Sequence, residues 1–483
     1  MAMTNVPLSI RLPFFWGEAA PAAQTPVSAR QKGLLIGQVT TSNYGVPRAI
    51  ASADQAASLF GRGSFLHRMA LKAFNACPWG DWTAIGVADA ADSTPATKTI
   101  TITASNAGAG TLRVWVGSDC QDIGVTASES ASDIATAIAA AFPSGGDYPM
   151  TGTHNSGVVT LTAKNKGTAG NGIYVAVDGN IPLPSGVTAV VATGATGATD
   201  PTLTSTISAI ADKTYNKVAV WLNDLGDELS TDILDRWGWQ RQQHGYGFSA
   251  VNGTSGVGDT LGYTALLGAA STYAATHWTW SCLSLEPACK TPAFEAAAGL
   301  CAVALRSDDV DPGLTIHGLA LQGCPAADAG SQFTPKMRND LLYAGYTTCG
   351  DVGGILTVDR AVTRKTQNAY GSRDERQSSA AKIWLCEWAL NDLRATMETE
   401  YARCRLVNDG PAPEGCATPS MVRGTLIAWY EKLCRLGYAQ DPETFAANVQ
   451  VVRPTGDKNR LDALLPANLA DNFEIFAPVL SYS

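Results

Sequence analysis

The central stretch VAVWL (residues 218–222) and the later stretch GFSAV (residues 247–251) decide the fold. Both are short apolar runs, which are typical of strands covered on both faces. Between and after them the chain predicts two helices, a further strand and a third helix, at 229–242, 260–271, 278–283 and 292–305. Because strands that alternate with helices at this spacing form parallel sheets, residues 201–360 predict a mainly parallel, helix-covered α/β core.

The first part of this core is expected in residues 29–92. The stretch GLLIGQV (residues 33–39) predicts a buried strand between glycines. Residues 64–76 predict an amphipathic helix, because apolar residues recur at helical spacing and Ser64 is a good N-cap.

Between residues 93 and 200 the composition changes. Thr, Ala and Gly dominate, and apolar and polar residues alternate at 99–103, 112–116 and 158–162. One short helix at 132–141 interrupts the pattern. A period of two is typical of strands with one buried face, so we expect a β-rich domain inserted into the core over residues 93–200.

Residues 361–471 predict a helical domain with a small sheet. A long helix is expected at 381–406, and its apolar stripe is spaced 4, 3, 4, 4, 3 along Cys386, Leu390, Leu393, Met397, Tyr401 and Cys404. A second helix begins at Thr418-Pro419 and ends at Gly437, with a predicted buried face of Val422, Leu426, Trp429, Leu433 and Leu436. Residues 448–452 predict a strand.

Each end of the chain carries a segment that alternates like a strand. Residues 1–28 predict an arm in which Val6–Leu12 is bracketed by Pro7 and Pro13, and proline confines a strand to a sheet edge. Fully extended, this arm reaches about 90 Å, which a small domain cannot use on itself. Residues 472–483 predict a C-terminal extension with a strand at 472–477. We therefore expect both ends to reach neighbouring molecules.

Composition and charge exclude several classes of protein. The chain has 483 residues, of which 45% are hydrophobic and 16% charged, and this balance suits a folded protein with large cores. Its formal net charge of −9 provides no long-range attraction for nucleic acid. We expect no signal peptide, because Arg11 and two prolines interrupt any apolar run near the start of the sequence, and the longest uncharged stretch, 261–285, is interrupted by Gly, Ser, Thr and His. We expect a soluble protein without a membrane partner, made and assembled in a cytoplasm.

Cysteines and histidines do not predict a metal or cofactor. The 11 cysteines are odd in number and form no CxxC pair, so they predict buried free thiols in a reducing compartment. The five histidines show no metal-ligand spacing. Asp308, Asp309 and Asp311 could ligate a hard cation, but EF-hand spacing is absent and a turn after a helix is the better interpretation.

Two loops resemble catalytic motifs incompletely. Gly61-Arg62-Gly63-Ser64 lacks the features of a phosphate or dinucleotide loop and predicts a tight turn with a helix cap. Ser255 lacks the glycine two residues later that a nucleophile elbow needs. Missing motifs lower the expectation of an enzyme without excluding one, because catalytic groups can converge from distant positions.

A basic group in the last third has two interpretations. Arg360, Arg364, Lys365, Arg373 and Arg376 form either a solvated loop or an electrostatic contact with an acidic partner.

Several segments, in the same order, resemble contractile-tail sheath proteins, especially those of Mu-like phages. They are LFGRGSFLHRM (59–69), KGTAGN (166–171), DRWG with RQ and FSA (235–250), TPSMVRGTLIAWY (418–430) and KNRLDALLP (458–466). The last two cover nearly fifty residues and are the most specific. None of these segments is a catalytic motif, so the resemblance predicts no catalytic residue.

The resemblance implies a subunit that polymerises into a helical sleeve around a tail tube. Terminal strands of neighbouring subunits would add to a small sheet in the C-terminal domain. The implied donors are Val6, Leu8, Ile10, Leu12, Phe473, Ile475 and Phe476, and the implied acceptor residues are Val449, Val451 and Val452. Arg364, Lys365, Arg373 and Arg376 are candidate contacts to the tube.

The resemblance also implies an arrangement and a set of partners. The helical domain would face the tube and the β-rich insert would face outward. The partners would be other copies of the chain, the tail tube protein, and the baseplate and tail terminator proteins, within a virion assembled in the host cytoplasm.

Two alternatives remain at this point. One is a soluble nucleotide- or metal-dependent enzyme on the α/β core, which a monomer that binds a small ligand would favour. The other is a β-rich surface adhesin or cell-envelope layer, which a secretion signal would favour.

Overall fold

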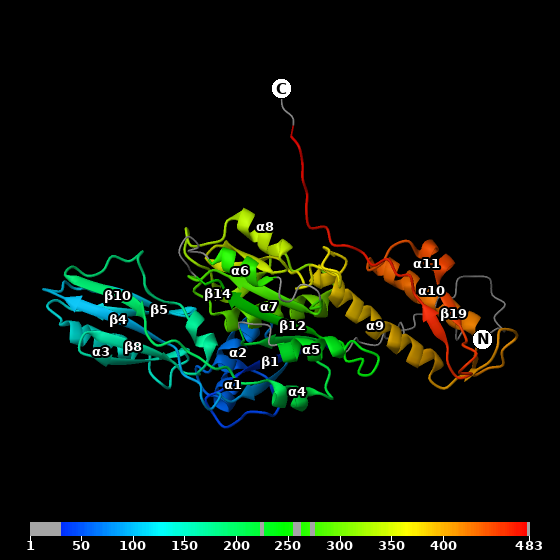
Figure 1. The fold of residues 1–483 in the computed structure, drawn as a ribbon, viewed down its shortest axis with the longest axis horizontal. Coiled ribbons are helices and arrows are strands. Elements are labelled where there is room, and N and C mark those ends of the chain that lie inside the picture. Colours follow the sequence, from blue (N-terminus) through cyan, green and yellow to red (C-terminus); the bar gives the residue numbers. More distant parts are fainter. Residues whose placement is uncertain (1–29, 223–226, 255–261, 271–275, 481–483) are drawn as a thin grey trace, which may run out of the picture. The chain divides into compact units, whose positions relative to one another are not determined.

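The computed structural model describes residues 30–222, 227–254, 262–270 and 276–480 (Figure 1). From Gln31 onward the chain forms one compact unit. The predicted arm with its strand Val6–Leu12, and Ser255, lie outside the described residues.

A six-stranded sheet forms the α/β core. Its order is β13 (Trp280–Leu285), β12 (Tyr246–Asn252), β11 (Lys217–Val220), β1 (Lys32–Gln38), β3 (Asp81–Val87) and β2 (Arg48–Ile50). All neighbours pair in parallel except β2, which runs antiparallel to β3. The predicted mainly parallel sheet is confirmed, and β1 pairs directly with β11 although the β-rich segment separates them in the sequence.

Two long helices pack on this sheet (Figure 1). α2 (Phe65–Ala76) contacts α7 (Ala293–Val310) along its length, and the rings of Phe65 and Phe294 stack with centroids 4.4 Å apart. The Ser64 hydroxyl accepts a hydrogen bond from the His67 backbone N–H, so the predicted N-cap is confirmed. The shorter helices are α1 (Ala53–Phe60), α4 (Thr204–Ile210), α5 (Asp227–Asp235), α6 (Tyr263–Ala269) and α8 (Pro335–Tyr343).

The helix predicted at 229–242 is wrong at its C-terminal end. α5 ends at Asp235, because the chain turns at Gly238 and the Gln243 N–H returns to the Arg236 carbonyl. Arg236 follows the last residue of α5, and its guanidinium donates hydrogen bonds to the carbonyls of Lys213 and Ile210. The helix therefore ends, because of tertiary hydrogen bonds, before the residue at which the apolar periodicity predicted its end.

Gly247 lies where β12 meets β13 and allows their close packing. A Cβ at this position would lie 2.0 Å from Cε3 of Trp280, a side chain that is fully buried. We expect Gly247→Ala to lower the free energy of unfolding by about 1–3 kcal/mol through overpacking. Chemical denaturation measures this, and Gly268→Ala, which would meet no atom within 4 Å, is the matched control.

The segment predicted as β-rich contains two sheets and one helix. Its elements are β4 (Thr97–Ala104), β5 (Gly110–Val116), β6 (Asp119–Val125), α3 (Ala131–Ala141), β7 (Met150–Asn155), β8 (Val158–Ala163), the 3-10 helix η1 (Thr168–Gly172), β9 (Val175–Val177) and β10 (Val187–Thr193). The strand orders are β10-β4-β8-β7 and β6-β5-β9. Ile100 and Ile102 are buried whereas Thr101 and Thr103 are exposed, as the alternation predicted.

A fourth sheet was not expected from the sequence. It contains β14 (Ala320–Pro325), β16 (Ile355–Arg360) and β15 (Thr348–Val352) in that order, all antiparallel. Only partial alternation marks these strands, since Gly350, Gly353 and Gly354 interrupt the hairpin.

The last third contains α9 (Ala380–Tyr401), β17 (Arg405–Leu406), β18 (Cys416–Ala417), α10 (Pro419–Leu436), α11 (Pro442–Asn448), β19 (Gln450–Val452) and β20 (Asp462–Leu464). The predicted limits of α10 are confirmed: the Thr418 hydroxyl caps its start and Gly437, at φ 83°, ends it. The helix predicted to reach residue 406 is wrong there, because β17 pairs with β18 instead.

The two predicted apolar faces are each wrong at one position. Leu390 on α9 is 43% exposed and Leu436 on α10 is 51% exposed, so neither belongs to the buried face. Trp388 and Ala389 take the place of Leu390 in the apolar cluster between α9 and α10.

α9 is shared by two hydrophobic clusters. Its first turns, from Ala380 to Trp384, belong to the large cluster of the α/β core. From Trp388 onward it packs on a second cluster, formed with Leu426, Tyr430 and Leu433 of α10. One continuous helix therefore connects the core to the C-terminal helices.

None of the eleven cysteines, all of which lie in the described residues, forms a disulfide, and six of them are buried. No helix among the described residues is long and apolar enough to cross a bilayer.

Candidate assembly site at the C-terminal arm

A two-stranded sheet stands beside α10. β19 pairs antiparallel with β20, with Val451 opposite Ala463. Within the described chain the sheet has no third strand, so each strand retains one edge of unpaired backbone groups. The acceptor residues Val451 and Val452 lie in β19, while the third, Val449, lies just before it and is buried. β20 was not predicted as a strand, although Leu461, Ala463 and Leu465 alternate with polar or exposed neighbours.

Helices α10 and α11 hold this sheet in place. The Arg423 guanidinium donates to the carbonyls of Val449 (3.2 Å for Nε) and Ala446. The ring of Tyr430 stacks on Phe445 with centroids 3.8 Å apart. Its hydroxyl donates to the Gln440 carbonyl and accepts from the Asn468 N–H, each at 2.8 Å. The segments before and after the sheet are therefore fixed to α10.

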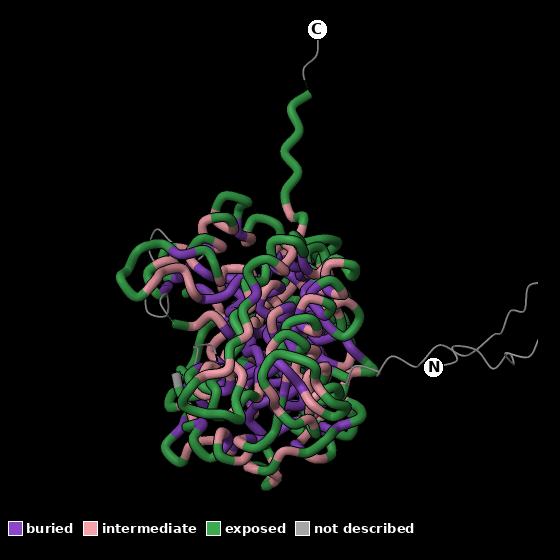
Figure 2. Tube along the Cα trace, turned by 90° about the vertical axis from the view of Figure 1, so that its right-hand side faces the viewer, coloured by how far each residue is buried: buried purple, intermediate pink, exposed green. Residues whose placement is uncertain are grey.

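The C-terminal arm, residues 472–480, is extended and forms no strand pairing with the described chain (Figure 2). The predicted strand at 472–477 is absent within the subunit, because no neighbouring strand accepts its backbone hydrogen bonds. Five large apolar side chains are left in solvent, with exposed fractions of Phe473 82%, Ile475 77%, Phe476 76%, Val479 93% and Leu480 88%. Such a run on one short segment marks an interaction surface. Val479 and Leu480 extend the donor set beyond the residues predicted.

Four polar contacts fix the root of the arm. Asn472 donates to the Gly313 carbonyl at 2.9 Å and accepts from the Thr315 N–H at 3.3 Å. Lys382 pairs with Asp471 at 2.8 Å, and Arg360 pairs with Glu474 at 2.7 Å. The arm is thus anchored up to Glu474 and free from Ile475 onward.

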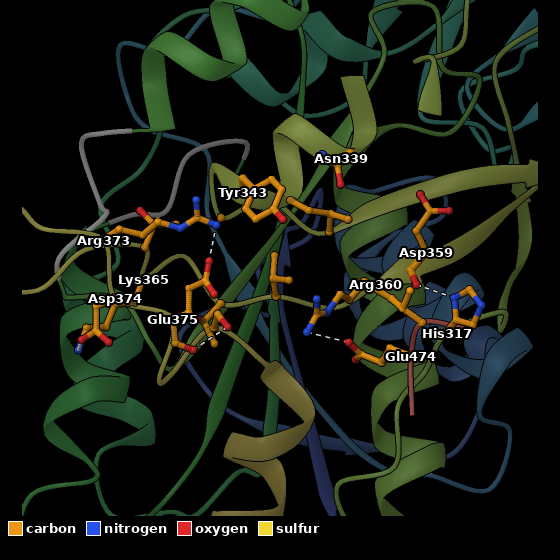
Figure 3. Close-up of a pocket in the computed structure, with 17 residues that line it drawn as sticks. His317, Asn339, Tyr343, Asp359, Arg360, Lys365, Arg373, Asp374, Glu375 and Glu474 are labelled. Atoms are coloured by element: carbon orange, nitrogen blue, oxygen red, sulfur yellow. Dashed lines mark hydrogen bonds and ion pairs between the residues drawn. The ribbon is translucent and has the colours of Figure 1, made fainter. Parts of the chain in front are cut away.

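The base of the arm closes a pocket between β16 and residues 363–378 (Figure 3). Arg360 points from β16 toward Glu474, and the His317 ring contacts the Asp359 carbonyl. Arg373 pairs with Glu375 and lies over the Tyr343 ring. Cations and carboxylates alternate around the wall, so the pocket is not a strongly basic site.

The structure corrects one predicted tube contact. Arg364 is 2% exposed, and its guanidinium lies over the Tyr346 ring at 4.0 Å, so the prediction that it contacts the tube is wrong for this conformation. Lys365 is largely covered and bonds Gln377. Arg373 and Arg376 remain exposed, but Arg376 pairs with Asp374, and its hydrogen bonds hold the pKa of that carboxyl well below the usual range.

The remaining chemical candidates are structural. The Gly63 N–H donates to the His67 ring at 2.9 Å, and burial lowers the pKa of His67 to about 4, so this loop is the predicted turn and cap. Asp308 belongs to the last helical turn of α7 and not to the loop that follows this helix. Its buried carboxylate lies 2.8 Å from the Lys217 ammonium. Among the described residues no cluster of His, Cys, Asp or Glu could hold a metal ion.

Two buried ionic clusters were missed by the sequence analysis. Glu295 of α7 bonds Arg68 and Lys72 of α2, and Arg68 continues to Asp119 of β6. Lys217 of β11 bonds Asp308 of α7 and Glu387 of α9. Ion partners separated by 51 to 227 positions leave no local signal in a sequence.

The fold and the C-terminal arm define a mixed α/β protein in which residues 473–480 present apolar side chains, and backbone that no described strand pairs, to solvent. Against known proteins, the chain is 26% identical to the Mu-like prophage FluMu tail sheath protein of Haemophilus influenzae, over 100% of this chain and 99% of that protein. The resemblance to Mu-like tail sheath proteins is therefore confirmed along the whole chain. No protein-family model matches.

Solved structures share the fold at low identity. A chain in the structure of the anti-feeding prophage baseplate aligns with a TM-score of 0.50 and 8% identity, over 98% of this chain and 99% of that one. The sheath tail protein of Listeria innocua aligns with a TM-score of 0.48 and 13% identity, over 92% of each chain. The first of these supports the mixed α/β fold.

Proposed function

We propose that the chain is the structural subunit of a contractile phage tail sheath. It polymerises into a helical sleeve around the tail tube, and the sleeve contracts to drive the tube through the host envelope for genome ejection. Two observations carry the proposal: the arm exposes a run of apolar side chains, and the small sheet β19–β20 has two open edges within the described residues. The full-length similarity to a tail sheath protein supports it.

Strand addition between subunits explains why both features are exposed. Backbone groups of a donor strand satisfy an open edge, and alternate side chains enter apolar positions. The sheet has two open edges, one on β19 and one on β20. The N-terminal and C-terminal segments of neighbouring subunits would each add a strand to one of these edges. The N-terminal donors are Val6, Leu8, Ile10 and Leu12, and the C-terminal donors are Phe473, Ile475 and Phe476, extended by Val479 and Leu480.

Proline makes the donors suitable for edges. Pro478 has no N–H to donate, as is also true of Pro7 and Pro13. A strand with such a gap is tolerated at an edge and not in the middle of a sheet. Head-to-tail contacts made this way do not close on themselves and build a helical filament.

The remaining assignments follow from this role. The helical domain faces the tube, with Lys365, Arg373 and Arg376 as contacts, and the β-rich insert faces outward. Partners are further copies of the chain, the tail tube protein, and the baseplate and terminator proteins, in a virion assembled in the host cytoplasm. The proposal includes no cofactor, nucleic acid, membrane or catalytic step.

Deleting residues 1–28 tests the role of the N-terminal arm. The intact chain is expected to form tubes or sheets visible by negative-stain microscopy, whereas the deletion variant stays folded and unpolymerised. Circular dichroism confirms folding, since the compact unit begins at Gln31. Polymers as abundant as those of the intact chain would refute the proposed role of this arm.

A further inference from the structure

One lysine and two carboxylates are enclosed where α9 leaves the core. The side chains of Lys217, Asp308 and Glu387 are 0%, 0% and 1% exposed. The Lys217 ammonium lies 2.8 Å from Asp308 Oδ2 and 3.2 Å from Glu387 Oε2. With all three groups ionised the cluster has a net charge of −1, which is costly away from water.

The geometry shows which carboxylate is the ion partner of Lys217. Asp308 is nearer to the ammonium and also accepts the Gly313 N–H at 3.1 Å. Glu387 accepts from Asn216 Nδ2 at 2.6 Å, and Asn216 is held in this orientation because its Oδ1 accepts the Lys32 N–H. Asp308 and Lys217 therefore form a neutral pair, and a proton on Glu387 makes the whole cluster neutral.

Among the described residues, no charge other than that of Lys217 compensates an ionised Glu387. Cys301 of α7 faces Lys217, and burial raises the pKa of its thiol, so it stays neutral. On the side of α10, Tyr438 faces Asp311 and Asp308, and burial together with these carboxylates raises its pKa to about 12. Trp384 lies beside Lys217, with the ammonium 5.3 Å from the ring centroid, and does not titrate.

The cluster occupies the joint between the two parts of α9. Trp384, one turn before Glu387, packs in the core, and Trp388, the next residue, packs with the C-terminal helices. We propose that the Lys217–Asp308–Glu387 cluster is a proton-dependent joint, which holds α9 on the core while Glu387 is protonated and loosens it when that proton is lost.

The direction of the effect follows from the titration. Burial raises the pKa of Glu387 to about 7, with Lys217 opposing and Asp308 reinforcing the shift. An open joint exposes Glu387 to water and restores its ordinary pKa of 4.5. Because the closed joint binds the proton more tightly, closure weakens as the pH rises from about 4.5 to about 7. The opening equilibrium rises by up to about 300-fold across that interval.

Infrared spectroscopy of the full-length chain tests the protonation directly. A buried carboxylic acid C=O band is expected near pH 6, is lost above about pH 8, and is missing from Glu387→Gln. Glu398→Gln, on the exposed face of the same helix, is the control and retains the band. A wild-type spectrum without this band near pH 6, or one equal to that of Glu387→Gln, would overturn the proposal.

Hydrogen exchange tests the loosening. After correction for the intrinsic pH dependence, amides of 380–392 are expected to exchange faster at high pH in the wild type and to show no such change in Glu387→Gln. Asp308→Asn removes the reinforcing charge and shifts the midpoint downward by roughly one pH unit or more. An unshifted midpoint in Asp308→Asn, or equal pH dependence in wild type and Glu387→Gln, contradicts the joint.

Discussion

Truncation after Glu474 is expected to abolish polymers while leaving the subunit as stable as the intact chain. The removed segment contains Ile475, Phe476, Val479 and Leu480, each at least 76% exposed, so its loss uncovers no core. In a neighbouring sheet, each such side chain would contribute about 1.5–3 kcal/mol on burial. Since about 1.4 kcal/mol is a tenfold change in association, losing several of them reduces polymer yield far more than tenfold.

The design of this truncation retains the root of the arm. The ion pair between Arg360 and Glu474 is retained, and so are the two hydrogen bonds of Asn472 with the backbone. Sedimentation and negative-stain microscopy measure the polymers, and thermal unfolding measures the stability. Val310→Ser is the matched control, because Val310 is 82% exposed yet lies outside the arm. Unchanged polymer yield in the truncated chain would refute donation by this arm, whereas lower stability would show that the segment packs on its own subunit.

Replacing Glu295 by alanine is expected to cause the largest loss of stability among the substitutions considered. Its carboxylate bonds Arg68 Nε at 2.7 Å and Lys72 Nζ at 3.2 Å, and both cations are nearly fully buried. Without Glu295, Arg68 retains Asp119 as an ion partner, whereas Lys72 retains hydrogen bonds to Ser118 Oγ and the Gly323 carbonyl but has no carboxylate paired with it among the described residues. Breaking a buried ion cluster in this way costs about 3–5 kcal/mol, measured as the free energy of unfolding in denaturant.

The pH dependence of unfolding distinguishes Glu295 from an ordinary core residue. Burial alone raises the pKa of Glu295, but Arg68 and Lys72 outweigh it and lower the pKa from 4.5 to about 2. The contribution of Glu295 is therefore present above about pH 4.5 and is lost as the pH falls toward 2. In Glu295→Ala, the free energy of unfolding is therefore expected to depend less on pH between about 2 and 4.5. Arg113→Ala, which breaks an exposed pair with Asp122, is the control and is expected to change stability very little, because solvent screens the pair. An equal loss in both variants would contradict the role of Glu295.

The two buried carboxylates respond to pH in opposite directions. Glu295 faces two cations and is stabilised as an anion, whereas Glu387 shares one cation with Asp308 and is favoured as the neutral acid. Raising the pH through the acidic range strengthens the contact between α2 and α7, while raising it toward neutrality weakens the joint at α9. The ratio of cations to carboxylates in each cluster decides the sign.

Local patterns predicted the elements that depend on neighbours in sequence. The apolar runs at 218–222 and 247–251 became β11 and β12, and Ser64, Thr418 and Gly437 cap helices as expected. Capping and periodicity act within a few residues, so they can be recognised without a structure. They failed where distant groups intervened: Arg236 bonds carbonyls 23 and 26 positions away, and β18 pairs with the residues that α9 was predicted to include.

The candidate site was predicted in part. The alternating apolar residues of the C-terminal arm identified Phe473, Ile475 and Phe476 as unusual for a chain end, and the structure leaves them exposed. Arg364 was misassigned because sequence shows a charge but not the Tyr346 ring that covers it. β20 was missed because only its pairing with β19 makes three exposed residues a strand.

By itself, the sequence determined the α/β alternation, the β-rich composition of residues 93–200 and the caps of the main helices, because each depends on side chains a few positions apart. Only the tertiary structure decided which charges are buried together, where α5 and α9 end, and which edges of the small sheet stay open. These features depend on groups that meet in space, and in a low-dielectric interior the balance of a few such charges outweighs local preference.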